Sequence, residues 1–292
     1  MGRRVIPASY AVVSLFQALV LALLQGVTEL FPVSSLGHTI ILPKLLGWSI
    51  NQDDPTFLAF VVLLHVGTAT ALVIYFWRDW WAIVRAVIGS AVAGRMQGTP
   101  EERLGWRLIF GTIPVGLAGL LFQKPVQSLF GNPRAAAVFL VINGGIMFAG
   151  ERLRRRAVAA ETGRTELDQL KVPTAIGIGS AQILALLPGI SRSGSTMVAG
   201  LLGNLTHESA ARFSFLLATP IIFAAGLLKI PDLFAPAALP HLPTYLLAGV
   251  VAGAAAFFSV VYLMRYFRVG RLDPFAIYCA AFGILAFILL SR

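Results

Sequence analysis

The chain has 292 residues, of which 57% are hydrophobic and only 12% are charged. Soluble domains carry about 25% charged residues, so much of this surface must face lipid rather than water. The composition excludes an ordinary soluble fold and indicates an all-α, polytopic membrane protein. The net charge of +10 is explained by Lys and Arg in cytoplasmic loops, so we expect no nucleic-acid partner. Cys279 is the single cysteine, which excludes an intrachain disulfide.

The first segment, residues 8–46, is broken at Pro32. Its second arm, from Ser35 to Leu46, would be about 18 Å long at 1.5 Å per residue, which is too short to cross ~30 Å of hydrocarbon. Irregular backbone at membrane depth must be buried in protein or line a polar cavity. We therefore expect a re-entrant helix-turn-helix that enters and leaves the membrane by the same face.

Six long apolar runs follow, each long enough to be a membrane-spanning helix. They cover residues 57–77, 104–122, 135–150, 213–228, 243–264 and 274–290. A second broken segment, residues 173–205 with its break at Pro188, lies between the third and fourth runs. The chain is thus predicted to hold six spans and two re-entrant segments.

The order of these elements indicates a duplication within one membrane domain, residues 1–292. PVSSLGHT (32–39) and PGISRSGST (188–196) each have a proline followed three residues later by serine. Because three spans is an odd number, the second repeat must begin on the opposite side of the membrane from the first. We expect inverted repeats at 8–150 and 173–290, joined by a cytoplasmic linker at 151–172, with a polar site where the broken segments meet.

Basic residues predict the orientation. The side of the membrane that holds the 151–172 linker carries roughly twice as many Lys and Arg residues as the other side, and such positive loops lie in the cytoplasm. Both termini are therefore expected on the outer face of a bacterial cell (inner) membrane. The first broken segment would then dip in from the outer face and the second would rise from the inner face.

The first break concentrates polar residues in apolar sequence. Glu29 is an ionisable residue at membrane depth, where such residues are usually functional, and Gln25 lies one turn earlier on the same helix face. An ion pair with Arg192 would be a structural alternative for Glu29. Ser35 and His38 share a face of the next short helix, so a hydroxyl would lie beside a proton-transfer group. The alternative for this serine is a helix N-cap.

The second break has the composition of an anion site. Free backbone amides and the positive end of a helix attract phosphate, and Arg192 can pair with two phosphate oxygens at once. Ser191, Ser193 and Thr196 add hydroxyl donors, so these four residues are the candidate phosphate-binding set. Snorkelling to an interface is the structural alternative for Arg192. His65, within the 57–77 run, is interpreted as a hydrogen-bonded packing residue.

These motifs carry a family resemblance. QGVTELFPVSSLGH (25–38) and LLPGISRSGST (186–196) resemble the two signature motifs of the undecaprenyl-diphosphatase, or bacitracin-resistance, family. FSFLLATP (213–220) and FWR (76–78) extend the resemblance over most of the chain. The chain departs from the pattern at Gln25, where many members have a second Glu, and at Leu36, where a small polar residue is common.

The resemblance implies a reaction and a set of functional residues. The reaction is hydrolysis of undecaprenyl diphosphate to undecaprenyl phosphate and inorganic phosphate, which recycles the lipid carrier for peptidoglycan and other envelope glycans and confers bacitracin resistance. It implies a site reached from the outer face, a polyprenyl diphosphate substrate within membrane lipid, and a divalent cation, Mg²⁺ or Ca²⁺. The residues implied are Gln25, Glu29, Ser35, His38, Ser191, Arg192 and Thr196.

Residue chemistry and resemblance together give the expected roles. Ser35, His38 and Glu29 are the candidate catalytic residues, with Ser35 as nucleophile and His38 as general base or acid. Attack by water ordered by Glu29 stays open as the other route. Glu29 and Gln25 are the candidate metal ligands. The sequence leaves open whether the protein is a homo-oligomer.

A polyprenyl-phosphate transporter, or flippase, is the alternative function. Inverted repeats whose broken helices meet at the membrane midplane are common in carriers, and a flippase would also need an arginine and helix N-termini at its centre. Transport requires no nucleophile or proton donor, however, so Ser35, His38 and Glu29 favour an enzyme. A purely structural scaffold would leave the polar cluster unexplained.

Overall fold

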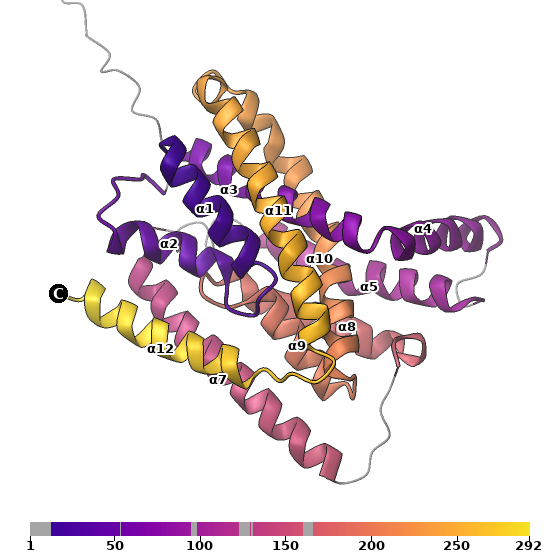
Figure 1. The fold of residues 1–292 in the computed structure, drawn as a ribbon. Coiled ribbons are helices and arrows are strands. Elements are labelled where there is room, and N and C mark those ends of the chain that lie inside the picture. The colour runs from indigo at the N-terminus through magenta and orange to yellow at the C-terminus, as the bar shows by residue number, and fades with distance from the viewer. Residues whose placement is uncertain (1–12, 53, 95–97, 123–128, 130, 160–165) are drawn as a thin grey trace, which may run out of the picture.

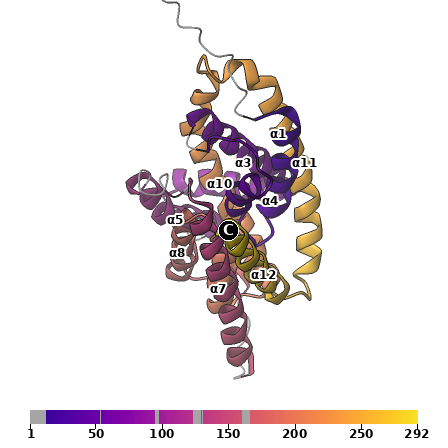
Figure 2. The ribbon, with the colours of Figure 1, turned by 90° about the vertical axis from the view of Figure 1, so that its left-hand side faces the viewer.

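The computed structural model describes residues 13–52, 54–94, 98–122, 129, 131–159 and 166–292 (Figures 1 and 2). Within these residues the regular structure is entirely helical. This confirms the all-α prediction.

Six helices are long and apolar enough to cross a membrane, as far as the described residues go. The chain is therefore a multi-pass membrane protein, and all six predicted spans are confirmed. The helices are α3 (Pro55–Tyr75), α5 (Pro100–Leu121), α7 (Pro133–Ala159), α10 (His207–Lys229), α11 (Leu242–Tyr266) and α12 (Asp273–Leu290).

Local sequence sets where these helices start. Asp54 caps α3 by accepting a hydrogen bond from the Thr56 amide. Thr99 and Glu102 form a reciprocal capping box at the start of α5. Both helices have proline in the first turn, where its missing N–H costs nothing.

Both predicted breaks are present as pairs of short helices. The first pair is α1 (Leu15–Thr28) and α2 (Ser35–Leu45). The second pair is α8 (Val172–Ser180), extended by the 3₁₀ turn η2 (Ala181–Leu186), and α9 (Arg192–Leu202). The 14 residues of α1 would reach about 21 Å, so it does not cross ~30 Å of hydrocarbon. That these pairs are re-entrant in a membrane stays a prediction.

One helix was not predicted from the sequence. The amphipathic helix α4 (Trp77–Val92) follows α3 directly and packs against α5. Its Trp77 and Trp81 rings lie under the guanidinium groups of Arg78 and Arg85. The sequence feature that could have predicted this helix is the helical spacing of its tryptophan and arginine residues. Short 3₁₀ turns complete the fold: η1 (Leu167–Gln169), η3 (Ile230–Phe234) and η4 (Leu239–His241).

The first short helix of each half packs against the other half. In the first half α1 packs against α11 of the second half, and in the second half α8 packs against α5 of the first half. α3 packs against both α10 and α11, and α7 lies along α12 (Figure 1). This reciprocal packing of α1 and α8 is what a duplication predicts, because the first helix of each broken segment packs against the other repeat. The inverted topology itself stays a prediction.

Small residues allow the closest of these contacts. A Cβ added to Gly179 of α8 would lie 1.9 Å from the carbonyl oxygen of Gly111 in α5. A Cβ added to Gly26 of α1 would lie 2.4 Å from the carbonyl oxygen of Ala252 in α11. Close backbone approach at small residues is a principal source of helix association in membranes. It holds each broken segment against the opposite half.

We expect Gly179→Ala to destabilise the protein, because its methyl group cannot fit against the Gly111 carbonyl. Overpacking of this kind costs about 1–3 kcal/mol. Thermal unfolding of the detergent-purified variant should therefore begin at a lower temperature. The control is Gly177→Ala on the same helix, where an added Cβ meets no atom within 4 Å. Equal melting temperatures for the two variants would contradict the proposed α8–α5 contact.

Candidate active site

The two breaks meet at the centre of the protein. A Cβ added to Gly37 in α2 would lie 3.0 Å from the Cα of Gly189 in the second break. Ser34 has φ 67° and Gly189 has φ 109°, so each break contains a left-handed residue. Such a conformation is costly for serine and is typical of functional sites. The contact between the two breaks brings the N-termini of α2 and α9 close together.

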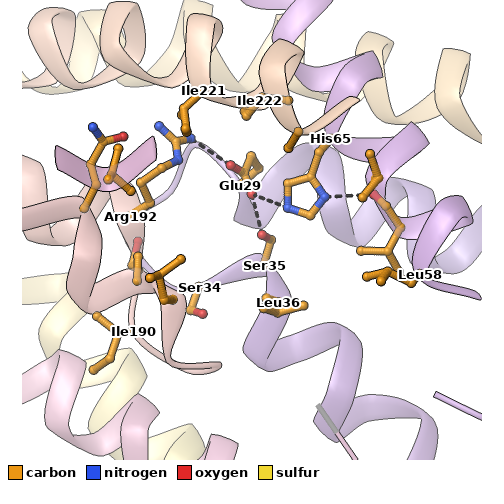
Figure 3. A pocket seen from close by; sticks show the side chains of 18 residues that line it. Glu29, Ser34, Ser35, Leu36, Leu58, His65, Ile190, Arg192, Ile221 and Ile222 are labelled. Atoms are coloured by element: carbon orange, nitrogen blue, oxygen red, sulfur yellow. Dashed lines mark hydrogen bonds and ion pairs between the residues drawn. The ribbon is translucent and has the colours of Figure 1, made fainter. Parts of the chain in front are cut away.

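Glu29 is the polar centre of this junction (Figure 3). Its Oε1 lies 2.7 Å from Nη2 of Arg192 in the second break. Its Oε2 accepts hydrogen bonds from the Ser35 hydroxyl and, at 3.1 Å, from Nε2 of Gln25. Nε2 of His65 in α3 lies 3.3 Å from the same oxygen. A buried carboxylate requires such partners, so Glu29 binds three separate segments together.

His65 joins α3 to the Glu29 carboxylate. Its Nδ1 lies 2.8 Å from the carbonyl oxygen of Val61, and a carbonyl only accepts, so Nδ1 is the donor in this contact. Its Nε2 lies 3.3 Å from Oε2 of Glu29. The ring therefore bridges the α3 backbone and the Glu29 carboxylate. This role was not predicted from the sequence, where the only indication is a histidine inside an apolar span.

A cavity of about 300 Å³ opens at this junction. Its polar lining consists of Glu29, Ser34, Ser35, His65, Gln182, Ser191 and Arg192, and the rest is apolar. Nη1 of Arg192 and Oε1 of Gln182 are buried without a hydrogen-bond partner among the described residues. The Arg192 guanidinium therefore keeps a spare donor after pairing with Glu29. A spare guanidinium donor suits an anionic ligand.

The predicted phosphate-binding set divides into two pairs. Ser191 and Arg192 line the cavity. Ser193 and Thr196 are buried and do not line it. The Thr196 hydroxyl donates to the carbonyl of Arg192 at 2.8 Å and lies 2.6 Å from Oγ of Ser214. Ser193 and Thr196 therefore stabilise the start of α9, which positions Arg192, and do not form part of the cavity surface.

His38 does not pair with Ser35. Its Nδ1 lies 2.7 Å from the carbonyl oxygen of Ser34, and its Nε2 lies 2.8 Å from the Tyr278 hydroxyl. Its ring stacks on Phe282 with centroids 4.9 Å apart, and it does not line the cavity. The expected Ser35–His38 arrangement is replaced by hydrogen bonding of Ser35 to Glu29.

Asn143 of α7 joins the two breaks. Its Oδ1 accepts a hydrogen bond from the Ser191 amide at 3.0 Å, and its Nδ2 donates to the carbonyl oxygen of Pro32 at 3.1 Å. The side chain is fully buried, so these bonds are strongly favoured over leaving either group unsatisfied. Asn143 was not predicted as a site residue, and its only indication in the sequence is an amide side chain within an apolar run.

The residues can be tested against the implied divalent cation. No group of three or more His, Cys, Asp or Glu side chains is placed to hold a metal in the described part of the chain. Oε1 of Gln25 is, however, a buried acceptor without a hydrogen-bond partner, next to Glu29. One carboxylate and an amide oxygen are hard donors of the kind that Mg²⁺ uses when phosphates supply further ligands. Glu29 lines the cavity and Gln25 does not, so within the described residues one of the two predicted ligands is placed to share a cation with a phosphate, and an all-protein metal centre is not formed.

Comparison with known proteins assigns the family. Residues 18–285 match the family described as "Bacitracin resistance protein BacA". An "Undecaprenyl-diphosphatase" of Acidiphilium cryptum is 50% identical over 278 residues, which cover 94% of this chain and 97% of the relative. One from Mycolicibacterium paratuberculosis is 49% identical, covering 92% and 95%. "Undecaprenyl-diphosphatase 2" of Chromobacterium violaceum is 48% identical, covering 92% and 96%.

The match extends over nearly all of the chain and of each relative. The chain therefore belongs to the bacitracin resistance protein BacA family. The family resemblance found in the sequence motifs is confirmed.

The relatives are named as undecaprenyl diphosphatases, so undecaprenyl diphosphate is the substrate for the test. We expect Asn143→Ala to lower its turnover by at least about tenfold, because the Pro32 carbonyl and the Ser191 amide lose a buried hydrogen-bond partner. The measurement is phosphate release together with substrate affinity and thermal stability. Ser90→Ala is the control, since it removes a hydrogen bond to Trp106 away from the cavity. Loss of stability with unchanged turnover per folded molecule would show that Asn143 has no role in positioning the site.

Proposed function

We propose that this protein hydrolyses undecaprenyl diphosphate to undecaprenyl phosphate and inorganic phosphate. The observation that carries the proposal is a serine hydroxyl hydrogen-bonded to a buried carboxylate, beside an arginine whose Nη1 has no hydrogen-bond partner among the described residues, in a largely apolar cavity. The reaction recycles the lipid carrier for peptidoglycan and other envelope glycans and accounts for bacitracin resistance.

Phosphate binding rests on Arg192 and the two helix N-termini. The guanidinium keeps one nitrogen on Glu29 and has the other available for a phosphate oxygen. The amides at the starts of α2 and α9 add positive dipole ends. Apolar walls lower the local dielectric, which strengthens these interactions with a diphosphate. Ser191 at the cavity wall supplies a further hydroxyl.

Ser35 is the proposed nucleophile and Glu29 its base. The Ser35 oxygen attacks the terminal phosphorus, its proton passes to Oε2 of Glu29, and the bond from phosphorus to the bridging oxygen breaks. Undecaprenyl phosphate leaves. Water then attacks the phosphoserine, the Ser35–phosphorus bond breaks, and the Ser35 oxygen takes back the proton from Glu29 while the water proton leaves on inorganic phosphate. Direct attack by water held by Glu29 is the alternative route that the experiment below distinguishes.

The two histidines have different proposed roles. His65 holds the Glu29 carboxylate toward Ser35 through its Nε2, as the third member of a triad orients the base. His38 holds the start of α2 through the Ser34 carbonyl and Tyr278. The proton-transfer role expected for His38 from the sequence is therefore assigned to the Glu29–His65 pair.

A divalent cation, Mg²⁺ or Ca²⁺, would be held by Glu29 together with substrate oxygens, with Gln25, which contacts Glu29 but does not line the cavity, as the second predicted ligand. When bound it supplies positive charge that neutralises the phosphates. Arg192 supplies the protein's own positive charge at the same place. The protein residues thus bind and orient the diphosphate from one side of the cavity.

We further propose that the protein lies in the inner membrane of a bacterial cell with both termini on the outer face. The excess of Lys and Arg on the side of the 151–172 linker supports this orientation. The cavity would then be reached from the outer face. Assembly into a homo-oligomer is compatible with the proposal and is not required by it, since the cavity is formed within one chain.

The flippase alternative is not favoured. The relatives are named as diphosphatases, and a carrier has no use for a serine bonded to a general base. The Ser35–Glu29 hydrogen bond is the structural feature that separates the two functions.

We expect Ser35→Ala to lose phosphate release by orders of magnitude while still binding undecaprenyl diphosphate, because Arg192 is untouched. His65→Ala should lose more turnover than His38→Ala, since His65 contacts the base and His38 does not. Phosphate release and substrate affinity are measured for the parent and all three variants in detergent. Rapidly quenched parent protein is searched for phosphoserine at position 35.

Two results would contradict parts of this account. A fully active Ser35→Ala variant would remove Ser35 as nucleophile and leave water as the attacking group. Absence of phosphate release from the parent protein, with substrate still bound, would favour the flippase.

A further inference from the structure

A second and larger cavity lies beside the active site. It measures about 1110 Å³ and runs between α4, α5 and α10. Leu58, Val115, Leu186, Ile221 and Ala225 line both this cavity and the active-site cavity. The two cavities are therefore adjacent and share a wall of apolar side chains, while Glu29 and Arg192 line only the active-site cavity.

The larger cavity is an apolar groove. Its lining is dominated by Leu, Ile, Val, Ala and Gly, and Thr112 and Lys229 are among its few polar residues. Several lining side chains are more than half exposed, including Ile88, Leu117, Leu120 and Leu228. In a membrane protein such apolar exposure faces lipid tails. The groove thus lies between the active-site cavity and the side of the protein that faces the bilayer.

We propose that this α4–α5–α10 groove binds the isoprene units of the substrate next to the diphosphate. The inference rests on the proposed function and names the path of the lipid chain. The diphosphate and the chain are one molecule, so when the phosphates lie at Arg192 the first isoprene units must leave the cavity through its wall. The shared apolar wall leads them into the groove, where burial of each methylene group is favourable by about 0.8 kcal/mol.

Two glycines of α5 form part of the groove lining and are suited to a test. Gly116 and Gly119 both line the groove, and an added Cβ at either one meets no atom within 4 Å. A side chain introduced there would therefore start in open space at its Cβ and extend into the groove. Gly145 of α7 likewise has no atom within 4 Å of an added Cβ, but it does not line the groove. It is a matched helical control.

The test compares Gly116→Leu, Gly145→Leu and the parent on two substrates: undecaprenyl diphosphate and a five-carbon prenyl diphosphate that is too short to fill the groove. Gly116→Leu should raise KM for the long substrate by about tenfold or more, as expected when an apolar subsite is blocked. Its kinetics on the short substrate should stay at the parent value. Gly145→Leu should match the parent on both.

Photocrosslinking gives an independent measurement. An undecaprenyl diphosphate with a diazirine on its second isoprene unit should label peptides from α4, α5 or α10, and excess unlabelled substrate should prevent the labelling. Excess phospholipid should not. Displacement by phospholipid alone would mean that the groove holds bilayer acyl chains, which would overturn the proposal.

The kinetic results also distinguish a failure of the groove assignment from a failure of the proposed function. Parent-like KM for the long substrate in Gly116→Leu, or an equal loss on both substrates, would overturn the groove assignment. An inactive parent would refute the proposed function instead, and the crosslinking result would still report where the chain lies.

Discussion

The structure depends on one buried negative charge that must be neutralised inside a membrane protein. Removing a charge from water costs several kcal/mol even after relaxation, and the Glu29 carboxylate is nearly buried. Its partners Arg192 and His65 come from the second break and from α3. The Glu29 carboxylate therefore joins the two breaks to each other and to α3. The same requirement that closes the fold places a base, a nucleophile and a phosphate-binding arginine together.

The surrounding packing makes this arrangement rigid. The first helix of each short pair packs against the opposite half, with Gly26 and Gly179 allowing backbone contact. Asn143 fixes the Pro32 carbonyl and the Ser191 amide relative to each other. A site on fixed backbone needs little reorganisation during reaction, which is the main source of electrostatic catalysis. The apolar groove beside it extends the same site to the lipid part of the substrate.

Local signals predicted much of this from sequence. Long apolar runs identified the six spans, and Pro32 and Pro188 marked the two breaks. Glu29, Ser35, Ser191 and Arg192 were recognised because polar residues in apolar segments have few structural explanations, and the structure brings these four together. The missed features depend on tertiary contacts. His65 and Asn143 are isolated polar residues whose partners lie on other elements, and the short spacing of Ser35 and His38 concealed that their side chains have different partners. α4 was missed because its amphipathic pattern is too polar for a span.

The most direct test of the account is phosphate release by Glu29→Gln, expressed per folded molecule. Glutamine keeps the size of Glu29 and removes its charge, so Ser35 loses its base and Arg192 loses its counter-ion. General-base catalysis contributes about 10²–10⁴-fold, and we expect turnover of undecaprenyl diphosphate to fall by at least that range while folded protein is still recovered. Turnover at the parent level would contradict the central role of the Glu29 charge.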